Sequence, residues 1–292
     1  MADEIIGGYR LVKHMVTGQT SQVWEVVENS SGRHFALKLL LPEKAALPEY
    51  RRLMVHEAKV GKALAHPNIV KIVHIGESPK NPYYAMEFFP AGNLKTRMQK
   101  TAKDPKEKEW LLEHSQDILK QWATSLAFMN AKGWIHRDVK PENILVNSAG
   151  DVRLIDFALA IRPVKQGLFA RVFGRKVKPA GTRSYMSPEQ IRGGNIDARA
   201  DVYSFGAGVY ELMTGRPPFR AGSSNELLNK HIFEKPATPQ QYNPDVTKEF
   251  ADLVLQMLAK KREDRPRDFH QILIAMRAMK LYTSVESKST NS

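Results

Sequence analysis

The chain has 292 residues, of which 42% are hydrophobic and 26% are charged, as in ordinary folded globular proteins. A chain of this length buries roughly three quarters of its unfolded surface, so it needs no covalent cross-links for stability. It has no cysteine, which excludes disulfide scaffolds, iron–sulfur clusters, thiolate zinc sites and cysteine nucleophiles. Its first residues do not have the basic-then-apolar pattern of a secretory signal, and no apolar run approaches the roughly 18 residues of a membrane span. We therefore expect a cytoplasmic protein.

The net charge is unusual: 44 basic minus 31 acidic residues leaves +13. An excess of this size attracts polyanions in general, but a binding surface requires that the charges be clustered. Residues 159–183 hold more than half of the excess and no acidic residue. The basic residues there are Arg162, Lys165, Arg171, Arg175, Lys176, Lys178 and Arg183. No nucleic-acid-binding module is recognisable, so we expect no specific nucleic acid as a partner.

The amino-terminal part of the chain predicts a small lobe rich in strands. Short apolar and aromatic runs predict strands over residues 9–15, 23–28, 33–41, 69–75 and 83–88. A helix is predicted at Glu49–Leu64, ending before His66-Pro67 because the residue that precedes proline avoids helical geometry. The break in composition at Pro90-Ala91-Gly92 marks the end of this lobe, which we place at residues 1–89.

Beyond this break the pattern is helical. Apolar residues at helical spacing predict a long helix over residues 110–131. Further helices are predicted over residues 200–214, 225–232, 248–258 and 269–279. Residues 90–282 therefore form a larger, mainly helical lobe, and residues 283–292 form a polar tail.

Two segments carry most of the chemical information. His136-Arg137-Asp138-Val139-Lys140-Pro141-Glu142-Asn143 lies between the long helix and a short apolar run, and Asp156-Phe157-Ala158 follows a second apolar run. Phosphoryl transfer needs a carboxylate to orient the nucleophile, a cation beside the moving phosphate and oxygen ligands for magnesium. Asp138 and Lys140 supply the first two, while Asn143 and Asp156 supply oxygen ligands for the metal.

These segments resemble the protein kinase superfamily, specifically bacterial-type Ser/Thr kinases, and the resemblance runs from about residue 9 to residue 281. The first segment differs from the catalytic-loop signature of the family only by Val139 in place of leucine. Ala36-Leu37-Lys38 is similar to the strand that carries the nucleotide-binding lysine, and Glu57 is similar to the helix residue that pairs with it. Later landmarks in the expected order are Ser187-Pro188-Glu189, Asp201–Gly206 and Arg265, the partner of Glu189.

The resemblance implies an α+β protein with the bilobal protein kinase fold, in which a small antiparallel-sheet lobe with one main helix precedes a larger helical lobe. It implies transfer of the γ-phosphate of ATP to Ser or Thr hydroxyls of a protein substrate, with Mg²⁺ or alternatively Mn²⁺. Lys38 would bind the α- and β-phosphates and be held by Glu57. Asp138 would orient the hydroxyl, and Lys140 would neutralise the transferred phosphoryl group. Asn143 and Asp156 would hold the metal.

The same resemblance implies a nucleotide site between the lobes. Met86 would lie at the back of the adenine pocket, and Glu87 and Phe88 would offer backbone hydrogen bonds to adenine. The residues implied to contact the nucleotide are Val16, Gly18, Val23, Ala36, Lys38, Met86, Glu87, Phe88 and Leu145. The resemblance also implies that Asp201 caps backbone amides of the catalytic loop, and we expect His136 to be a packing residue rather than a base.

The chain departs from the family pattern at two places. The three glycine positions of the phosphate loop are Val16, Gly18 and Ser21, so only one glycine remains, and we expect weaker ATP binding. Ala158 stands where the family has glycine after Asp156-Phe157, and its methyl group restricts movement of this segment. These departures leave a pseudokinase, which binds nucleotide or partners without turnover, as the alternative. We favour an active enzyme because every residue that touches transferred charge is present.

Residues 159–183 precede the expected substrate site and have no Ser, Thr or Tyr before Thr182. We therefore expect activity that is independent of phosphorylation in the middle of this loop. Apolar residues recur at helical spacing at Leu168, Phe169, Val172 and Phe173, among the basic residues. Such a pattern suits an acidic partner or an anionic membrane surface, although the aromatic rings could equally pack against the lobes. A small-molecule phosphotransferase is the third possible class, but the Ser187–Glu189 element favours a peptide substrate.

Overall fold

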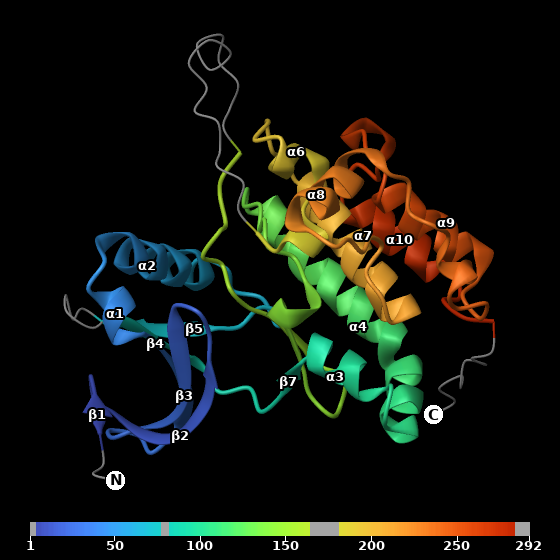
Figure 1. Cartoon of the computed structure of the whole chain (residues 1–292). Helices are drawn as coiled ribbons and strands as arrows, with labels where there is room; N and C mark the ends of the chain where they lie inside the picture. The colour runs from blue at the N-terminus through green and yellow to red at the C-terminus, as the bar shows by residue number, and fades with distance from the viewer. Residues whose placement is uncertain (1–3, 77–81, 164–180, 284–292) are drawn as a thin grey trace.

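The computed structural model describes residues 4–76, 82–163 and 181–283. They form two lobes, a curled β-sheet followed by a bundle of helices, as Figure 1 shows. The fold class predicted from the sequence is therefore confirmed. None of the helices in the described ranges has the length and apolar character needed to cross a membrane.

The N-terminal lobe is built on one antiparallel sheet. Its strands are β1 (Ile5–Ile6), β2 (Tyr9–Thr17), β3 (Ser21–Glu28), β4 (His34–Leu40), β5 (Ile72–Ile75) and β6 (Tyr83–Glu87). They lie in the order β1-β2-β3-β4-β6-β5. The sequence predicted a strand from residue 69, but β5 begins only at Ile72, because Ile69 forms a bridge with Leu154 of the other lobe instead. The lobe boundary proposed at residue 90 falls between β6 and β7.

Two helices belong to this lobe, the short α1 (Pro42–Ala45) and the main helix α2 (Pro48–Lys62). Helix α1 occupies the first half of the segment between Pro42 and Pro48, where the sequence analysis predicts no element. Gly61 lets α2 pack closely against its neighbours, since a Cβ atom there would lie 2.5 Å from Ile72 and 3.1 Å from Phe157. Helix α2 is thus fixed between its own sheet and a residue of the other lobe.

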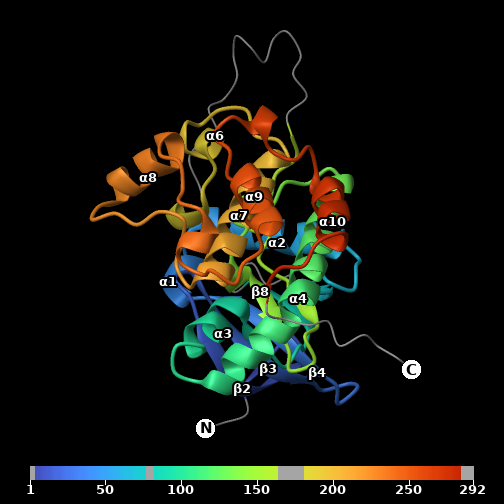
Figure 2. The same ribbon diagram turned by 90° about the vertical axis from the view of Figure 1, so that its right-hand side faces the viewer.

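The C-terminal lobe contains the remaining helices and a small sheet. The helices are α3 (Leu94–Lys100), α4 (Pro105–Ala131), α6 (Pro188–Ile191), α7 (Arg199–Thr214), α8 (Ser224–Phe233), α9 (Lys248–Met257) and α10 (Phe269–Arg277). The small sheet consists of β7 (Gly92–Asn93), β8 (Ile144–Val146) and β9 (Val152–Leu154). Short 3-10 turns lie at Pro141–Asn143, Arg183–Tyr185, Pro239–Gln241 and Arg262–Asp264. Figure 2 shows α8 standing out from the side of this lobe.

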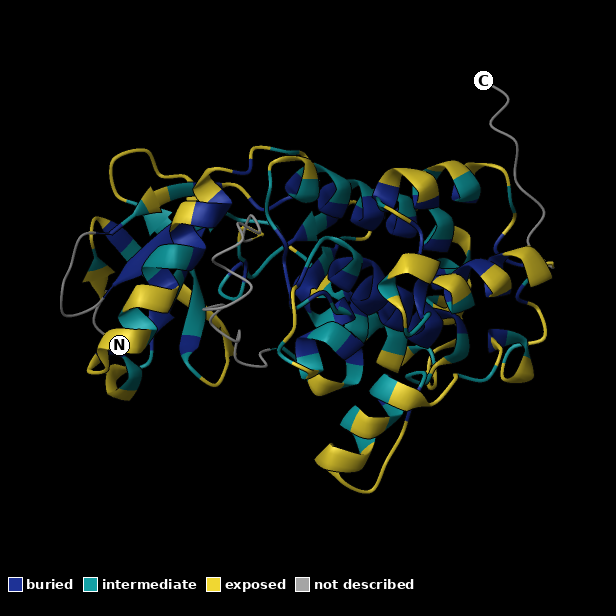
Figure 3. Cartoon of the chain, turned by 90° about the horizontal axis from the view of Figure 1, so that it is seen from above, coloured by how far each residue is buried: buried dark blue, intermediate teal, exposed yellow. Residues whose placement is uncertain are grey.

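Helix α7 is the centre of the C-terminal lobe, because almost every residue along it is buried. Trp122 of α4 makes an edge-to-face contact with Phe205 of α7, with ring centroids 4.9 Å apart, and Phe205 contacts Phe269 of α10 in the same way. Figure 3 shows that buried residues gather in the interior of the helical lobe. Aromatic pairs of this kind add to the burial of apolar surface, so α7 is a rigid base for the loops around it.

The lobes are joined by backbone contacts around Asn68, which no sequence motif marks. Its carbonyl accepts a hydrogen bond from Leu154 N of β9 (2.8 Å), and its side chain donates to Gln121 Oε1 of α4 (2.8 Å). Val70 N in turn donates to Leu154 O (3.0 Å). The turn after α2 is therefore fixed to the C-terminal lobe, which sets the position of α2 relative to the catalytic loop.

Candidate active site

A buried ion pair joins the sheet and the main helix of the N-terminal lobe. Lys38 Nζ of β4 lies 2.7 Å from Glu57 Oε1 and 2.9 Å from Oε2 of α2. The Tyr84 hydroxyl of β6 donates a further hydrogen bond to Glu57 Oε1 (2.9 Å). Glu57 keeps only 4% of its side-chain surface exposed, and a buried carboxylate requires such partners. The contact that the resemblance implied for Lys38 and Glu57 is thus present.

Lys38 and Asp156 stabilise each other's charged form. Burial acts to lower the pKa of Lys38, but the carboxylates of Glu57 and Asp156 outweigh it and hold that pKa well above its usual value. Burial acts to raise the pKa of Asp156, but the nearby Lys38 ammonium and the His136 imidazole hold it below its usual value. At neutral pH Lys38 is therefore an ammonium group and Asp156 is an ionised carboxylate.

Asp138 is the centre of a compact polar cluster on the catalytic loop. Its Oδ2 accepts a hydrogen bond from Lys140 Nζ (2.6 Å), and its Oδ1 accepts from the backbone N (2.9 Å) and the hydroxyl (3.0 Å) of Thr182. Asn143 Nδ2 donates to the Asp138 carbonyl (2.8 Å). Because the amide nitrogen of Asn143 faces Asp138, its Oδ1 is the atom left to accept a cation.

The buried Asp201 of α7 binds the backbone of the catalytic loop. Its carboxylate accepts hydrogen bonds from His136 N (2.8 Å), Arg137 N (2.9 Å) and Asn130 Nδ2 (3.2 Å), which is the capping contact expected from the sequence. Arg137 has φ 69°, a left-handed conformation that costs energy for a residue with a side chain. Asp201 stabilises this conformation because it binds the backbone N–H groups of both His136 and Arg137. His136 is fully buried, as expected, and its ring contacts Phe157.

The segment that contains Asp156 also adopts a special backbone conformation. Asp156 has φ 66°, and Ala158 N donates to its Oδ1 (3.3 Å). Arg137 and Asp156 are the non-glycine residues with positive φ in the described ranges, so Ala158 has an ordinary φ. Phe157 is buried against α2 and His136. Alanine is thus compatible with this conformation, and restricted movement of the segment stays a prediction.

The phosphate loop forms a tight turn between β2 and β3, in which Gly18 N donates to Ser21 O (2.8 Å). Gly18 has an ordinary φ, and a Cβ atom there would only approach Ser21 O to 3.5 Å. The described conformation therefore does not require glycine at position 18, nor at Val16 and Ser21, where φ is also not positive.

Strand register places the expected nucleotide-contacting residues of the sheet on one face. Val16 is directly opposite Val23, Val23 is opposite Lys38, and Ala36 is opposite Met86. Residues directly opposite one another point to the same face, and residues two apart in a strand do as well. This face therefore carries Val16, Val23, Ala36, Lys38 and Met86 together.

Three further residues of the expected nucleotide site lie outside this face. Leu145 comes from β8 of the C-terminal lobe, and Phe88 directly follows β6. The Glu87 amide already donates to Lys71 O (2.9 Å), and its carboxylate accepts from Lys71 N and Arg153 Nε. The amide and the carboxylate of Glu87 are thus already hydrogen-bonded within the protein.

Sequence reasoning missed several residues that position this site. Tyr84 reads as an ordinary core aromatic, and only its position opposite Lys38 in the sheet register signals a contact with Glu57. His56, next to Glu57, makes a hydrogen bond from Nε2 to Ala160 O (2.7 Å) and so joins α2 to the segment after Asp156. No sequence signal would have found that contact, because 104 residues separate its partners.

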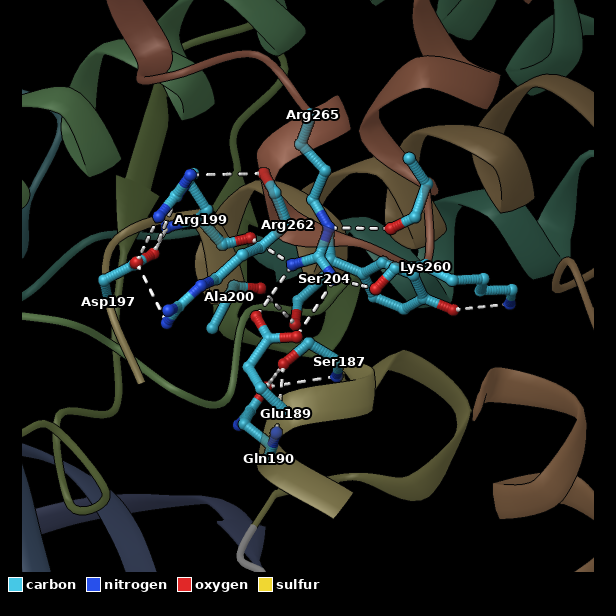
Figure 4. A network of polar contacts seen from close by, with 12 residues as sticks. Ser187, Glu189, Gln190, Asp197, Arg199, Ala200, Ser204, Lys260, Arg262 and Arg265 are labelled. Carbon is cyan, nitrogen blue, oxygen red and sulfur yellow. Dashed lines mark hydrogen bonds and ion pairs between the residues drawn. The ribbon is translucent and has the colours of Figure 1, made fainter. Parts of the chain in front are cut away.

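Residues 187–190 are anchored by Arg265, as Figure 4 shows. Arg265 has a fully buried side chain and binds both carboxylate oxygens of Glu189, at 2.7 and 2.9 Å. Helix α6 begins with a capping box between Ser187 and Gln190, and Gln190 Nε2 donates to Arg137 O (2.8 Å). Residues 187–190 are therefore fixed both to the core and to the catalytic loop.

The basic loop, residues 159–183, is described only in part. Positions 164–180, with Leu168, Phe169, Val172 and Phe173, lie outside the described residues, as does most of the polar tail. The described ends of the basic loop pack on the C-terminal lobe. Arg162 stacks on Trp134 at 4.6 Å, and Arg183 donates to Ser224 Oγ of α8 (2.8 Å).

Comparison with known proteins agrees with this geometry. The protein kinase domain model matches residues 9–276. The serine/threonine-protein kinase PknA of Mycobacterium tuberculosis is 32% identical over 280 residues, which are 93% of this chain and 62% of PknA. The corresponding figures for PknB of Mycobacterium leprae are 32% over 250 residues, 84% and 38%. The DNA damage-responsive serine/threonine-protein kinase RqkA of Deinococcus radiodurans is 30% identical over 275 residues, 90% of this chain and 38% of RqkA.

The chain belongs to the protein kinase domain family. It spans less than two thirds of the length of each of these relatives. Protein kinases use ATP and a divalent cation. The relatives carry the names of kinases, and neither departure from the family pattern disturbs the Lys38 or Asp138 cluster, so the pseudokinase alternative is not supported.

Proposed function

We propose that the chain is an ATP-dependent protein serine/threonine kinase. One observation carries this proposal: Lys38 of the N-terminal lobe, held by Glu57, and Asp156 of the C-terminal lobe are close enough to favour each other's charged form. The Asp138–Lys140–Asn143 cluster lies on the catalytic loop of the C-terminal lobe. The names of the relatives support the activity and the class of acceptor.

The residues present fit a magnesium nucleotide. Asp156 is ionised and Asn143 keeps an oxygen free, and both are the oxygen ligands that Mg²⁺ accepts. The described residues contain no group of three or more His, Cys, Asp or Glu side chains able to hold a metal. This suits Mg²⁺, which proteins bind through one or two side chains together with phosphate oxygens. The bound cation would supply positive charge to the phosphates.

Three side chains, Lys38, Asp138 and Lys140, would each have a separate role in phosphoryl transfer. Lys38, held by Glu57, would bind phosphate oxygens of the nucleotide. Asp138 would accept a hydrogen bond from the substrate hydroxyl and take its proton as the oxygen bonds to phosphorus, while ADP leaves. Lys140 Nζ, between Asp138 and Thr182, would neutralise charge on the transferred phosphoryl group.

The substrate we propose is a protein with a Ser or Thr acceptor. Support comes from the segment around Thr182 and α6, which is fixed beside Asp138 by Gln190 and Arg265 and offers a rigid edge for an extended peptide. A small-molecule phosphotransferase would have no use for such an edge.

The test is transfer of labelled phosphate from ATP with the wild-type chain and with Asp138→Asn. Each is offered a generic basic protein and, separately, an aminoglycoside. We expect the protein to be labelled on Ser and Thr, with a rate about 10² to 10⁴ times lower for the variant. Equal labelling by both chains would indicate a pseudokinase. Labelling of the aminoglycoside alone would indicate a small-molecule phosphotransferase.

A further inference from the structure

A second concave site lies on the C-terminal lobe, away from the nucleotide cleft. Residues of α6 and of the segment after α9 line a pocket of about 480 Å³. The lining residues are Glu189, Arg192, Lys260, Lys261, Arg262 and Glu263. We call it the α6 pocket. Glu189, one of the lining residues, is bound by the buried Arg265 (Figure 4).

The α6 pocket has an excess of positive charge. Its lining holds four basic and two acidic residues. One of the acidic residues, Glu189, is already paired with the buried Arg265. When Arg265 is counted with the lining, five cations face two anions and the net charge is +3. Arg262 is partly neutralised by Glu263 and Asp197. The exposed side chains of Arg192 and Lys261 make no hydrogen bond or ion pair with any residue that the structure describes. These two cations are thus available to a ligand.

An exposed aromatic ring lies beside Arg192. Phe233, the last residue of α8, is 75% exposed, and the Arg192 guanidinium lies 5.8 Å from its ring centre. Lys260 Nζ donates to the carbonyls of His231 (2.8 Å) and Lys230 (3.3 Å) at the end of α8, which fixes this helix end to the pocket. A large apolar side chain that is mostly exposed beside unpaired cations is typical of an interaction site.

The local electrostatics agree with the geometry. Burial and, to a smaller extent, repulsion by the neighbouring Arg265 lower the pKa of Lys260 to about 8. An anion bound in the pocket would reduce this repulsion.

We propose that the α6 pocket and Phe233 bind an acidic peptide segment of a protein partner, with carboxylates on Arg192 and Lys261 and an apolar side chain on Phe233. The partner that fits is the protein substrate, and in this respect the inference rests on the proposed function. The site lies on the same side as the substrate segment, because Arg183 next to Thr182 contacts Ser224 at the start of α8.

A peptide fits the site better than a membrane does. Membrane-binding faces present several apolar side chains to the bilayer, whereas Phe233 is the large exposed apolar residue of the described surface near the pocket. The two cations lie around a concavity, which a chain segment can enter and a lipid surface cannot.

The test is a direct binding measurement that needs no catalysis. The probe is a fluorescein-labelled peptide of Glu and Asp residues around one Phe, and its control has Gln and Asn in place of the acids. Anisotropy is measured with the wild-type chain, with Arg192→Glu/Lys261→Glu and with Phe233→Ser. The matched variant Lys103→Glu/Lys106→Glu makes the same change in net charge in the turn before α4 and in the first turn of α4, close to α3 and far from α6 in Figure 1.

We expect the acidic peptide to bind, the binding to weaken at least about fivefold with R192E/K261E and about threefold with F233S, and K103E/K106E to change it less than about twofold. Raising the salt concentration from about 50 to about 300 mM should weaken binding further. Equal losses in the two double variants would overturn the proposal, because they would point to attraction by net charge or by the basic loop. Binding to anionic vesicles but not to the peptide would also overturn it.

These outcomes are independent of the proposed activity. If the peptide binds as expected but the chain transfers no phosphate, the docking site stands and the proposed function fails. If the chain labels a basic protein but R192E/K261E binds the acidic peptide like the wild type, the function stands and the docking site fails.

Discussion

The buried His231 makes the stability of the C-terminal lobe depend on pH. Its side chain is fully buried on α8, next to the Phe219 ring, with Nδ1 3.0 Å from the Tyr203 hydroxyl. Burial and the nearby Lys260 ammonium lower the pKa of His231 to about 3. In the unfolded chain the pKa of a histidine is about 6.5.

The sign and the size of the effect follow from this difference. Below pH about 6.5 the unfolded state binds a proton at His231 that the folded state does not, so stability is fully present above this pH and falls as the pH falls toward 3. At pH 5 the solution is about 1.5 pH units below the pKa of His231 in the unfolded chain. The free energy of unfolding is therefore lower by about 2 kcal/mol than it is well above that pKa. His231→Gln removes the titrating group and leaves an oxygen that can accept from Tyr203.

The assay is urea unfolding followed by fluorescence between pH 5 and pH 7.5. We expect the wild type to lose about 2 kcal/mol more than His231→Gln over this range. The control is His270→Gln on α10, where the side chain is exposed, and it should follow the wild type. Parallel pH profiles of the wild type and His231→Gln would refute the reasoning, whatever the absolute stability of the variant.

Three further predictions concern the positioning of the catalytic loop and of Glu57. Asp201→Asn leaves one buried backbone N–H without an acceptor, so the free energy of unfolding in urea should fall by about 3 kcal/mol; a change below about 1 kcal/mol would contradict the capping role. Gly181→Ala puts a Cβ atom 2.8 Å from Arg137 O at φ 125°, and kcat in a steady-state kinase assay should fall about tenfold or more; a wild-type kcat would show that Thr182 does not need its present position. Tyr84→Phe removes one donor to Glu57 and should raise KM for ATP severalfold with the protein still folded; an unchanged KM would mean that Lys38 alone holds Glu57.

Much of the fold was predictable because its signals are local. The apolar periodicity of residues 110–131 identified α4, and only its first turn was missed, since Pro105 and the Asp104 cap precede the apolar stripe. Helix α3 was missed because it has only seven residues, too few for a clear period. The late start of β5 depends on the bridge from Ile69 to Leu154, a contact between lobes that strand propensity does not contain.

The candidate site was predictable to a similar extent. Lys38, Asp138 and Asp156 lie in segments whose residue types and spacing are informative by themselves. Tyr84 and His56 were not predictable, because each acts through a contact between segments distant in the chain. The loss of glycines at positions 16 and 21 suggested a weakened phosphate loop, yet the described turn has no positive φ at these positions. Whether ATP affinity is lowered stays a prediction.

The central claim is that Lys38 and Asp138, from different lobes, act on one nucleotide and its acceptor. A double-mutant cycle of kcat/KM with the wild type, Lys38→Met, Asp138→Asn and the double variant tests it most directly. Groups that act on a single transition state are strongly non-additive. We predict that each single variant loses about 10²-fold or more and that the double variant loses far less than the product. A double variant whose loss equals the product of the two would contradict the claim that both residues serve one site.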